Sequence, residues 1–253
     1  MPTGSAPRWT TERVTGLTRR CPACFAPLAR GAQDCPACGH DGSETVTGEQ
    51  PLTPGTRLLR RYRVGVRADT GFYWGFDEKE HVRVQLEAYT GPLHAAFFFR
   101  ADAMSRVADC AAIVPVLDAF STEGAAVCVH GAAAGFPLCR RAFPLSEAEL
   151  ALALSAAADA LLVLHSLKIA HGALDGDRLR VTEEGALRLL VPAAPCEASP
   201  AEDLVRLGAL LTPLHGKISK RLDDVLVRLS AGRYASVFEL RHALSGFAAA
   251  ERL

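Results

Sequence analysis

The pattern of hydrophobic and polar positions changes its period along this chain. In the first half, residues 62–66 and 82–86 alternate or cluster β-branched side chains, which predicts two β-strands on either side of an aromatic stretch at 72–76. After Pro92 the pattern predicts a helix. Two further strand-like runs follow at 114–120 and 125–130, separated by a turn at 122–124. The first half of the chain therefore predicts a mainly β structure.

From Ser146 onward the period becomes helical. Ser146 and Glu149 have the spacing of a capping box, and the apolar run that follows predicts a long helix ending near His165. A hairpin is expected over 181–190. Three more helices are expected, at about 201–211, over 222–229, and after a second capping box at Ser236 and Glu239. Strands first and helices afterwards predict the α+β class with two lobes.

Composition divides the chain into segments. Residues 1–20 are polar without an apolar period, which predicts a disordered tail. Residues 21–42 hold four clustered cysteines, and residues 43–56 are rich in Gly, Pro and Thr, which predicts a linker. Residues 57–253 are then expected to form one domain. Its β-rich lobe is expected at about 57–131 and its helical lobe at about 144–253.

Charge and hydropathy exclude some classes of partner. Lys and Arg together number 28, as do Asp and Glu, so a net charge of zero favours neither nucleic acid nor an anionic membrane. The first twenty residues lack the apolar core of a signal peptide, and the apolar run at 150–164 is interrupted by Ser155 and Asp159. We therefore expect a cytoplasmic protein without a membrane span. The scattered cysteines are expected to be reduced core residues: Cys110, Cys128, Cys139 and Cys196.

The clustered cysteines form two Cys-x-x-Cys knuckles, Cys21 with Cys24 and Cys35 with Cys38. Four thiolates at this spacing can close a tetrahedral Zn²⁺ site with no open position, so the metal is expected to be structural. The segment resembles a short zinc ribbon. Iron in a rubredoxin-like knuckle pair, a redox disulfide, and His40 in place of one cysteine remain alternatives.

Residues 57–247 resemble a bacterial Ser/Thr protein kinase domain through landmarks in matching order. The landmarks are 58–64 at the first strand, 113–120 before the fourth strand, 161–172 at the long helix and catalytic loop, 203–211 in the central helix, and 233–244 in the closing helix. No single landmark is specific, but five in order are. The resemblance implies a bilobal kinase-like fold preceded by a zinc ribbon.

The resemblance also implies where phosphoryl-transfer chemistry should lie, and those positions are degenerate. The third-strand Lys position is Gln85, which carries no charge to pair with phosphate. The base position is Ala173, and the metal-binding Asn position is Arg178, a fixed cation. The Mg²⁺-binding Asp position is Val191, and bulky aromatics occupy the expected glycine loop at 68–75.

The activation segment is also shortened, because only eleven residues lie between Val191 and Asp203. Asp175 and Asp177 are acids nearby, but neither is in register with a catalytic position. His171 and Asp203 are expected to be structural. Asp203 should accept hydrogen bonds from the backbone near His171.

These observations predict a catalytically inactive pseudokinase, not an enzyme, that acts as a scaffold or allosteric regulator in bacterial signalling. Its expected partners are proteins, such as an active kinase, a phosphatase or another signalling component, with no nucleic acid and no membrane. No ATP or Mg²⁺ is expected as cofactor. A nucleotide sensor or unorthodox transferase, and a zinc-ribbon nucleic-acid adapter, remain alternatives. The aromatics at 72–76 and 97–99 are expected in the core in place of the nucleotide, with a partner-facing surface as the alternative.

Overall fold

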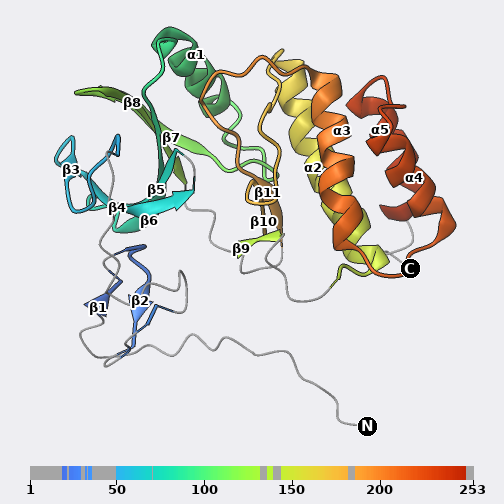
Figure 1. Ribbon diagram of the computed structural model, residues 1–253, viewed down its shortest axis with the longest axis horizontal. Coiled ribbons are helices and arrows are strands. Elements are labelled where there is room, and N and C mark those ends of the chain that lie inside the picture. The colour runs from blue at the N-terminus through green and yellow to red at the C-terminus, as the bar shows by residue number, and fades with distance from the viewer. Residues whose placement is uncertain are drawn as a thin grey trace.

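The computed structural model is a mixed α+β fold, with an antiparallel sheet at one end and a group of helices at the other (Figure 1). It describes residues 19–21, 23–29, 32, 34–35, 50–69, 71–131, 136–138, 144–181 and 186–248. The tail expected at 1–20 lies outside these residues up to position 18. Residues 43–49 of the expected linker, Cys38 and Cys139 also lie outside them.

The main sheet has six antiparallel strands in the order β3-β4-β5-β6-β8-β7. Their bounds are Arg57–Leu58 (β3), Tyr62–Asp69 (β4), Phe72–Asp77 (β5), Val82–Tyr89 (β6), Val116–Thr122 (β7) and Ala125–Gly131 (β8). The strands expected from the first half of the sequence are therefore confirmed, and the aromatic stretch is itself a strand. The turn between β7 and β8 includes Gly124, whose φ of 86° suits glycine.

The two faces of the sheet bury different kinds of side chain. One face carries an apolar cluster that includes Tyr62, Tyr73 and Leu86, closed by Leu52 from the preceding segment. Because side chains alternate along a strand, Gln85 and Glu87 on β6 point to the other face. That second face meets the helical part of the protein, so polar side chains are buried where the two parts join.

Helix α1, His94–Ser105, follows β6 and lies beside the sheet in Figure 1, which confirms the helix expected after Pro92. Phe97 and Met104 are buried in the main core. Phe99, in contrast, is 68% exposed. The aromatic residues therefore differ in burial. Phe72 and Phe97 are core residues, as expected, whereas Phe99 faces outward.

Among the described residues, the helical part contains four α-helices and a small sheet. The elements are α2 (Glu147–Ser166), α3 (Pro200–Leu211), the 3₁₀ turn η2 (Thr212–Leu214), α4 (Lys220–Ser230), α5 (Val237–Ala248), and strands β9 (Phe136–Pro137), β10 (Leu179–Val181) and β11 (Leu187–Leu189). The Ser146 hydroxyl accepts from the Glu149 N–H while the Glu149 side chain accepts from the Ser146 N–H, so the predicted capping box is confirmed. The hairpin expected at 181–190 is also confirmed as β10 and β11, although its turn lies outside the described residues.

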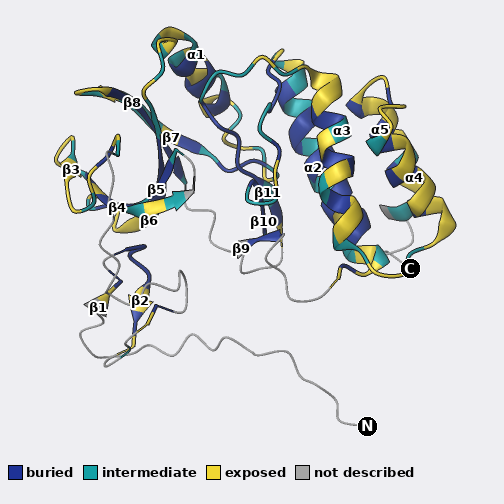
Figure 2. Cartoon of the chain, in the orientation of Figure 1, coloured by how far each residue is buried: buried dark blue, intermediate teal, exposed yellow. Residues whose placement is uncertain are grey.

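One hydrophobic core joins the sheet to the helices, and Figure 2 shows its buried residues running from α1 through α2 and α3. Ile113 bridges to Leu189 of β11, and the Val114 N–H donates to the Leu189 carbonyl at 2.9 Å. Among the described helices, α2 is the one long and apolar enough to cross a bilayer by length and composition, but half of that stretch is buried inside the protein. Such burial is also typical of a core helix, so α2 is weak support for a membrane span.

Candidate functional site

Three of the four predicted metal ligands come together in the structure. Cys21, Cys24 and Cys35 are buried, and their sulfur atoms all lie within 4.8 Å of one another. The Cys24 and Cys35 sulfurs are 3.6 Å apart. This group is compatible with a metal site, because thiolates around one Zn²⁺ lie at such separations. Cys38, the fourth predicted ligand, lies outside the described residues.

The backbone around the first knuckle, Cys21 and Cys24, forms a short hairpin. Strand β1, Arg19–Arg20, pairs with β2, Pro27–Leu28, as a short hairpin. Inside the hairpin the Phe25 N–H donates to the Cys21 carbonyl at 2.9 Å, and the Cys21 N–H donates to the Ala26 carbonyl at 2.9 Å. Phe25 takes a left-handed φ of 60° to close this turn. The hairpin is therefore bonded internally as well as through its cysteines.

The knuckle lies directly on the main sheet. The Val66 N–H donates to the Ala23 carbonyl at 3.0 Å, and the Arg83 Nε donates to the Cys24 carbonyl at 2.8 Å. A Cβ added to Gly65 would stand 2.2 Å from the Ala23 oxygen, so only glycine permits this approach at that position. The sequence left open whether the cysteine module docks or moves on its linker, and these contacts dock it on β4 and β6.

Aromatic side chains complete this interface. The rings of Phe25 and Phe76 lie 5.8 Å apart, and the Arg20 guanidinium lies 4.6 Å above the Phe76 ring. On the neighbouring strand, Arg83 lies 4.7 Å above the Trp74 ring. Cation–π contacts of this kind hold each guanidinium over a ring. The aromatic stretch 72–76 therefore supports the knuckle as well as the sheet.

The four degenerate positions predicted from the sequence do not gather into one polar site. Gln85 is fully buried on β6, and neither polar atom of its amide has a hydrogen-bond partner among the described residues. Arg178 is 5% exposed, and its guanidinium lies 4.3 Å above the Phe72 ring. Val191 is buried in the main core, and Ala173 donates its N–H to the His171 Nδ1 at 3.3 Å. Arg178 and Phe72 thus fill the junction between the two parts from opposite sides.

Glu87 forms two short hydrogen bonds across this junction, which the sequence did not predict. Its carboxylate accepts the Ala193 N–H at 2.7 Å and the Ala194 N–H at 2.8 Å. The same carboxylate lies 3.0 Å from the Nε2 of His130 on β8. The sequence did hold a signal for this contact. Glu87 lies two positions after Gln85, on the same face of a strand whose other face is apolar.

Arg100 on α1 makes the second missed contact. It is 8% exposed, and its guanidinium donates to the carbonyls of Ala170 at 3.0 Å and Pro192 at 3.1 Å. The acid that sequence reasoning considered in this helix, Asp102, instead lies on the exposed face and pairs with Arg106. Arg100 therefore ties α1 to the segments at Ala170 and Pro192.

The hydrogen bonds predicted for Asp203 are confirmed. Its carboxylate accepts the His171 N–H at 2.7 Å, the Gly172 N–H at 2.8 Å and a hydrogen bond from His165 Nε2 at 3.0 Å. Burial by itself would raise the pKa of Asp203, but the bonds from His165, Gly172 and His171 outweigh it, so that pKa is lowered. His171 is buried, and its Nε2 lies 3.0 Å from the Leu190 carbonyl. Burial lowers the pKa of His171, so the ring is neutral at pH 7 and serves packing and hydrogen bonding.

Asp175 and Asp177, the acids near the predicted catalytic positions, make local contacts. The Asp175 carboxylate lies 3.6 Å from Arg178 Nε and accepts the Asp177 N–H at 2.9 Å. Asp175 is mostly exposed and faces this local turn. Among the described residues, the junction between sheet and helices holds the buried guanidinium groups of Arg100 and Arg178 and the hydrogen-bonded Glu87 carboxylate.

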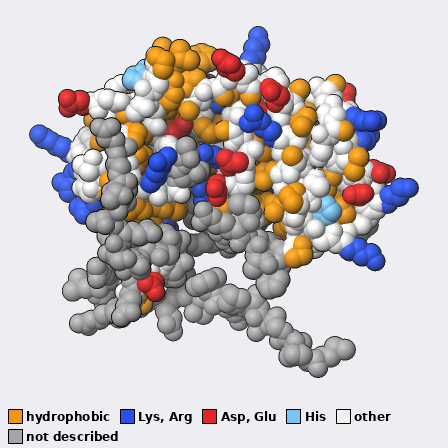
Figure 3. All heavy atoms as spheres, in the orientation of Figure 1, with side chains coloured by type: hydrophobic (Ala, Val, Ile, Leu, Met, Phe, Trp, Pro, Cys, Tyr) orange, Lys and Arg blue, Asp and Glu red, His pale blue; other side chains and the backbone are white. Residues whose placement is uncertain are grey.

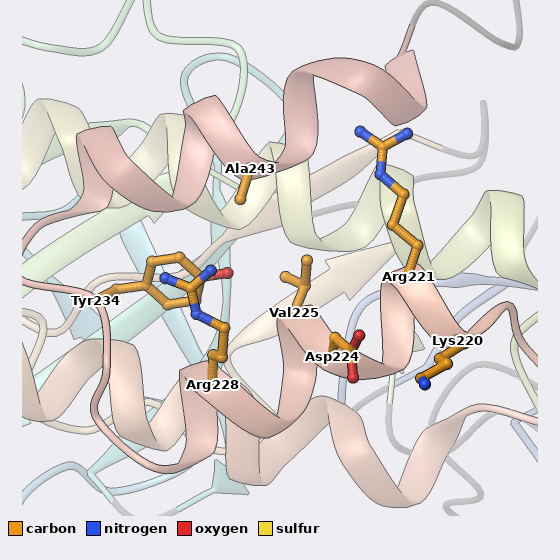
Figure 4. Close-up of a pocket in the computed structure, with 7 residues that line it drawn as sticks. All are labelled: Lys220, Arg221, Asp224, Val225, Arg228, Tyr234 and Ala243. Carbon is orange, nitrogen blue, oxygen red and sulfur yellow. The ribbon is translucent and has the colours of Figure 1, made fainter.

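Two surface pockets lie on the helical part of the protein. Figure 4 shows one between α4 and α5, where Tyr234 and Arg228 stack with the guanidinium 4.8 Å from the ring centroid. Its rim carries Lys220, Arg221 and Asp224. A second pocket is lined by Leu204 and Phe238, among others. Hydrophobic side chains also gather over α1 (Figure 3), where Leu93 and Phe99 are exposed.

A scan against models of protein families finds no match to this chain. A search of curated proteins likewise finds no significant match.

Proposed function

We propose that this chain is a kinase-like protein without phosphotransfer activity, a pseudokinase that acts through protein–protein contacts. The element order supports the proposal. An antiparallel meander of β4, β5 and β6 leads into α1, then β7 and β8, then a mainly helical part. This is the order in which the sequence landmarks of the kinase resemblance occur.

The observation that carries the proposal is the closed junction between sheet and helices. Where the resemblance puts a nucleotide, Arg178 stacks on Phe72 and the Glu87 carboxylate binds the backbone of Ala193 and Ala194. Phosphoryl transfer needs a cation for the phosphates and acids for Mg²⁺. In this protein the acid Glu87 lies on β6, the strand where the resemblance implies a cation. The cations Arg100 and Arg178 lie on α1 and beside Phe72. The positions implied for the phosphate-binding Lys and the Mg²⁺-binding Asn are held by Gln85 and Arg178, neither of which can fill that role.

The cysteine module belongs to the same proposal as a structural zinc site. Cys21, Cys24 and Cys35 supply three sulfurs, and Cys38 is the expected fourth ligand. With four protein ligands the metal has no open position for chemistry. Its role is then to hold the hairpin against β4 and β6. A fixed surface built from two modules suits a scaffold.

A nucleotide titration tests the inactive cleft. Thermal unfolding is followed with increasing ATP and Mg²⁺, and an active Ser/Thr kinase domain serves as the positive control. We expect no shift for this protein, whereas a shift of several degrees would revive the nucleotide-sensor alternative. In that case two variants locate the bound nucleotide: Phe72→Ala at the junction and Phe99→Ala as the exposed control. If only Phe72→Ala changes the shift in melting temperature, the nucleotide binds at the junction.

Co-purification tests the scaffold role. The protein is expressed at its native level with an affinity tag, and its partners are identified by mass spectrometry and rebuilt from purified components. We expect a stoichiometric complex with a kinase, a phosphatase or another signalling protein. The absence of any partner above an unrelated tagged control would count against the scaffold. Binding to DNA or RNA with a steep salt dependence would favour the nucleic-acid adapter instead.

A further inference from the structure

A second group of metal-ligand side chains lies inside the sheet, away from the cysteine knuckle. Glu87 is on β6, and Cys128 and His130 are on the paired strand β8. All three are buried, and one ligand atom from each lies within 4.8 Å of the other two. Glu87 stands opposite Cys128 in the register, and Gln85 stands opposite His130. The pleat therefore aims these four side chains at the same space.

Two of these side chains carry buried polar atoms without a hydrogen-bond partner among the described residues. Both amide atoms of Gln85 and the Nδ1 of His130 are in this state. Gln85 and His130 are each 0% exposed. Buried polar groups are nearly always bonded to protein, water or an ion, and an unsatisfied one costs about 1–3 kcal/mol. A fully buried amide beside a carboxylate, a thiol and an imidazole therefore points to a ligand at this place.

The charges of the group fit a divalent cation. The backbone of Ala193 and Ala194 orients the Glu87 carboxylate with two hydrogen bonds, as outer partners commonly orient a ligating carboxylate. A metal that displaces the thiol proton of Cys128 would leave one carboxylate and one thiolate, whose two negative charges balance a 2+ ion.

We propose that Glu87, Cys128 and His130 bind a divalent transition metal of the zinc class, with the Gln85 amide oxygen beside them as the fourth donor. A mixed nitrogen, sulfur and oxygen set suits zinc rather than calcium or magnesium, which take oxygen ligands. The ion would join β6, β8 and the segment at Ala193 at the centre of the closed junction. The site goes beyond the proposed function and stands or falls separately from the cysteine knuckle.

Metal counting on the purified full chain tests the site. The number of zinc ions per chain is measured by elemental mass spectrometry. The proteins compared are the wild type, Cys128→Ala, and Cys21→Ser in the knuckle. Cys110→Ser is the matched control, because Cys110 is a partly buried thiol outside both groups. We expect two zinc ions in the wild type and in Cys110→Ser, and one in each of the other two variants. Circular dichroism confirms that each variant is folded.

Cobalt substitution gives a second measurement that does not depend on stoichiometry. In a Cys21→Ser and Cys24→Ser background, bound Co²⁺ should still show visible bands of a tetrahedral site and one thiolate charge-transfer band. Cys128→Ala should remove the charge-transfer band, and His130→Gln should shift the visible bands. One zinc that is lost with Cys21→Ser but retained with Cys128→Ala would overturn the proposal. One zinc lost only with Cys128→Ala would support it and would count against the knuckle.

Discussion

Glu87 and Ala193, which are 106 residues apart in the chain, are joined by a hydrogen bond of 2.7 Å between the Glu87 carboxylate and the Ala193 N–H. The contact crosses from the central strand of the sheet to the segment that follows β11. Arg100 reaches the neighbouring carbonyl, Pro192, from α1 at 3.1 Å. The Glu87 carboxylate and the Arg100 guanidinium therefore hold the same short segment from two different elements, β6 and α1.

The first prediction concerns this clamp. Glu87→Gln keeps the size of the side chain but removes its charge, and it places an amide donor against backbone donors. Hydrogen bonds to charged groups contribute about 1.5–3 kcal/mol each, so we expect the free energy of unfolding to fall by about that amount. Urea denaturation with chelator present measures it without any metal contribution. Glu123→Gln, at an exposed turn, is the control and should change stability by less than about 0.5 kcal/mol. Equal effects of the two variants would contradict the clamp.

The second prediction concerns the docking of the knuckle. Gly65→Ala brings a methyl group against the Ala23 oxygen and the Phe25 ring, which stand 2.2 Å and 2.8 Å from the ideal Cβ position. We expect a loss of about 1–3 kcal/mol, typical of overpacking, and faster hydrogen exchange at Val66 and in the hairpin 19–28. Gly216→Ala is the matched control, because its nearest atom would lie 3.6 Å away. Unchanged exchange in Gly65→Ala would mean that the hairpin does not rest on β4.

The third prediction concerns metal removal. The chain has two tryptophans, Trp9 and Trp74, and Trp74 packs against the knuckle cluster. In a Trp9→Phe background, a strong chelator should loosen the hairpin and shift the Trp74 emission to longer wavelength, because metal binding and folding of such a module are coupled. Re-adding zinc should reverse the shift. Cys21→Ser should show the shifted emission from the start, whereas Cys110→Ser should behave as wild type. A chelator-insensitive spectrum would argue against a metal in the knuckle.

The fourth prediction concerns pH. His171 is buried beside Asp203, Arg178 and Arg100, and its folded pKa lies below that of the unfolded chain. Between these two values the unfolded state binds more protons, so stability must fall as pH drops below about 6.5. We expect a loss on the order of 1–2 kcal/mol from His171 by pH 5. Asp203, whose pKa is also lowered, extends the loss to more acidic pH.

The matched variant for this effect is His171→Gln, which retains a donor for the Leu190 carbonyl and cannot titrate. Its stability at pH 7 will be lower than that of the wild type, but its change between pH 7 and pH 5 should be smaller. His215→Gln, which replaces a partly buried histidine in the bridge to Leu145, is the control for the loss of a histidine elsewhere in the fold. Parallel pH profiles for wild type and His171→Gln would sink the assignment of this loss to His171.

Several features of the fold could be predicted from the sequence because they depend on neighbours along the chain. The capping box of Ser146 and Glu149 is local, and it starts α2 where the sequence indicates. Period-two patterning located β4 and β6, and the Cys-x-x-Cys spacing identified Cys21, Cys24 and Cys35 as a group. The bond from the His171 backbone to Asp203 was also foreseen, through the order of the kinase-like landmarks.

The sequence by itself therefore determined the α+β class, most element positions and the cysteine group. Only the tertiary structure decided that the knuckle rests on Gly65, that Arg100 clamps Pro192, and that Glu87 meets Cys128 and His130 in one buried space. The physical reason is the distance along the chain. Capping and periodicity act within a few residues, whereas these contacts join strands, a helix and loops that only the packed core brings together.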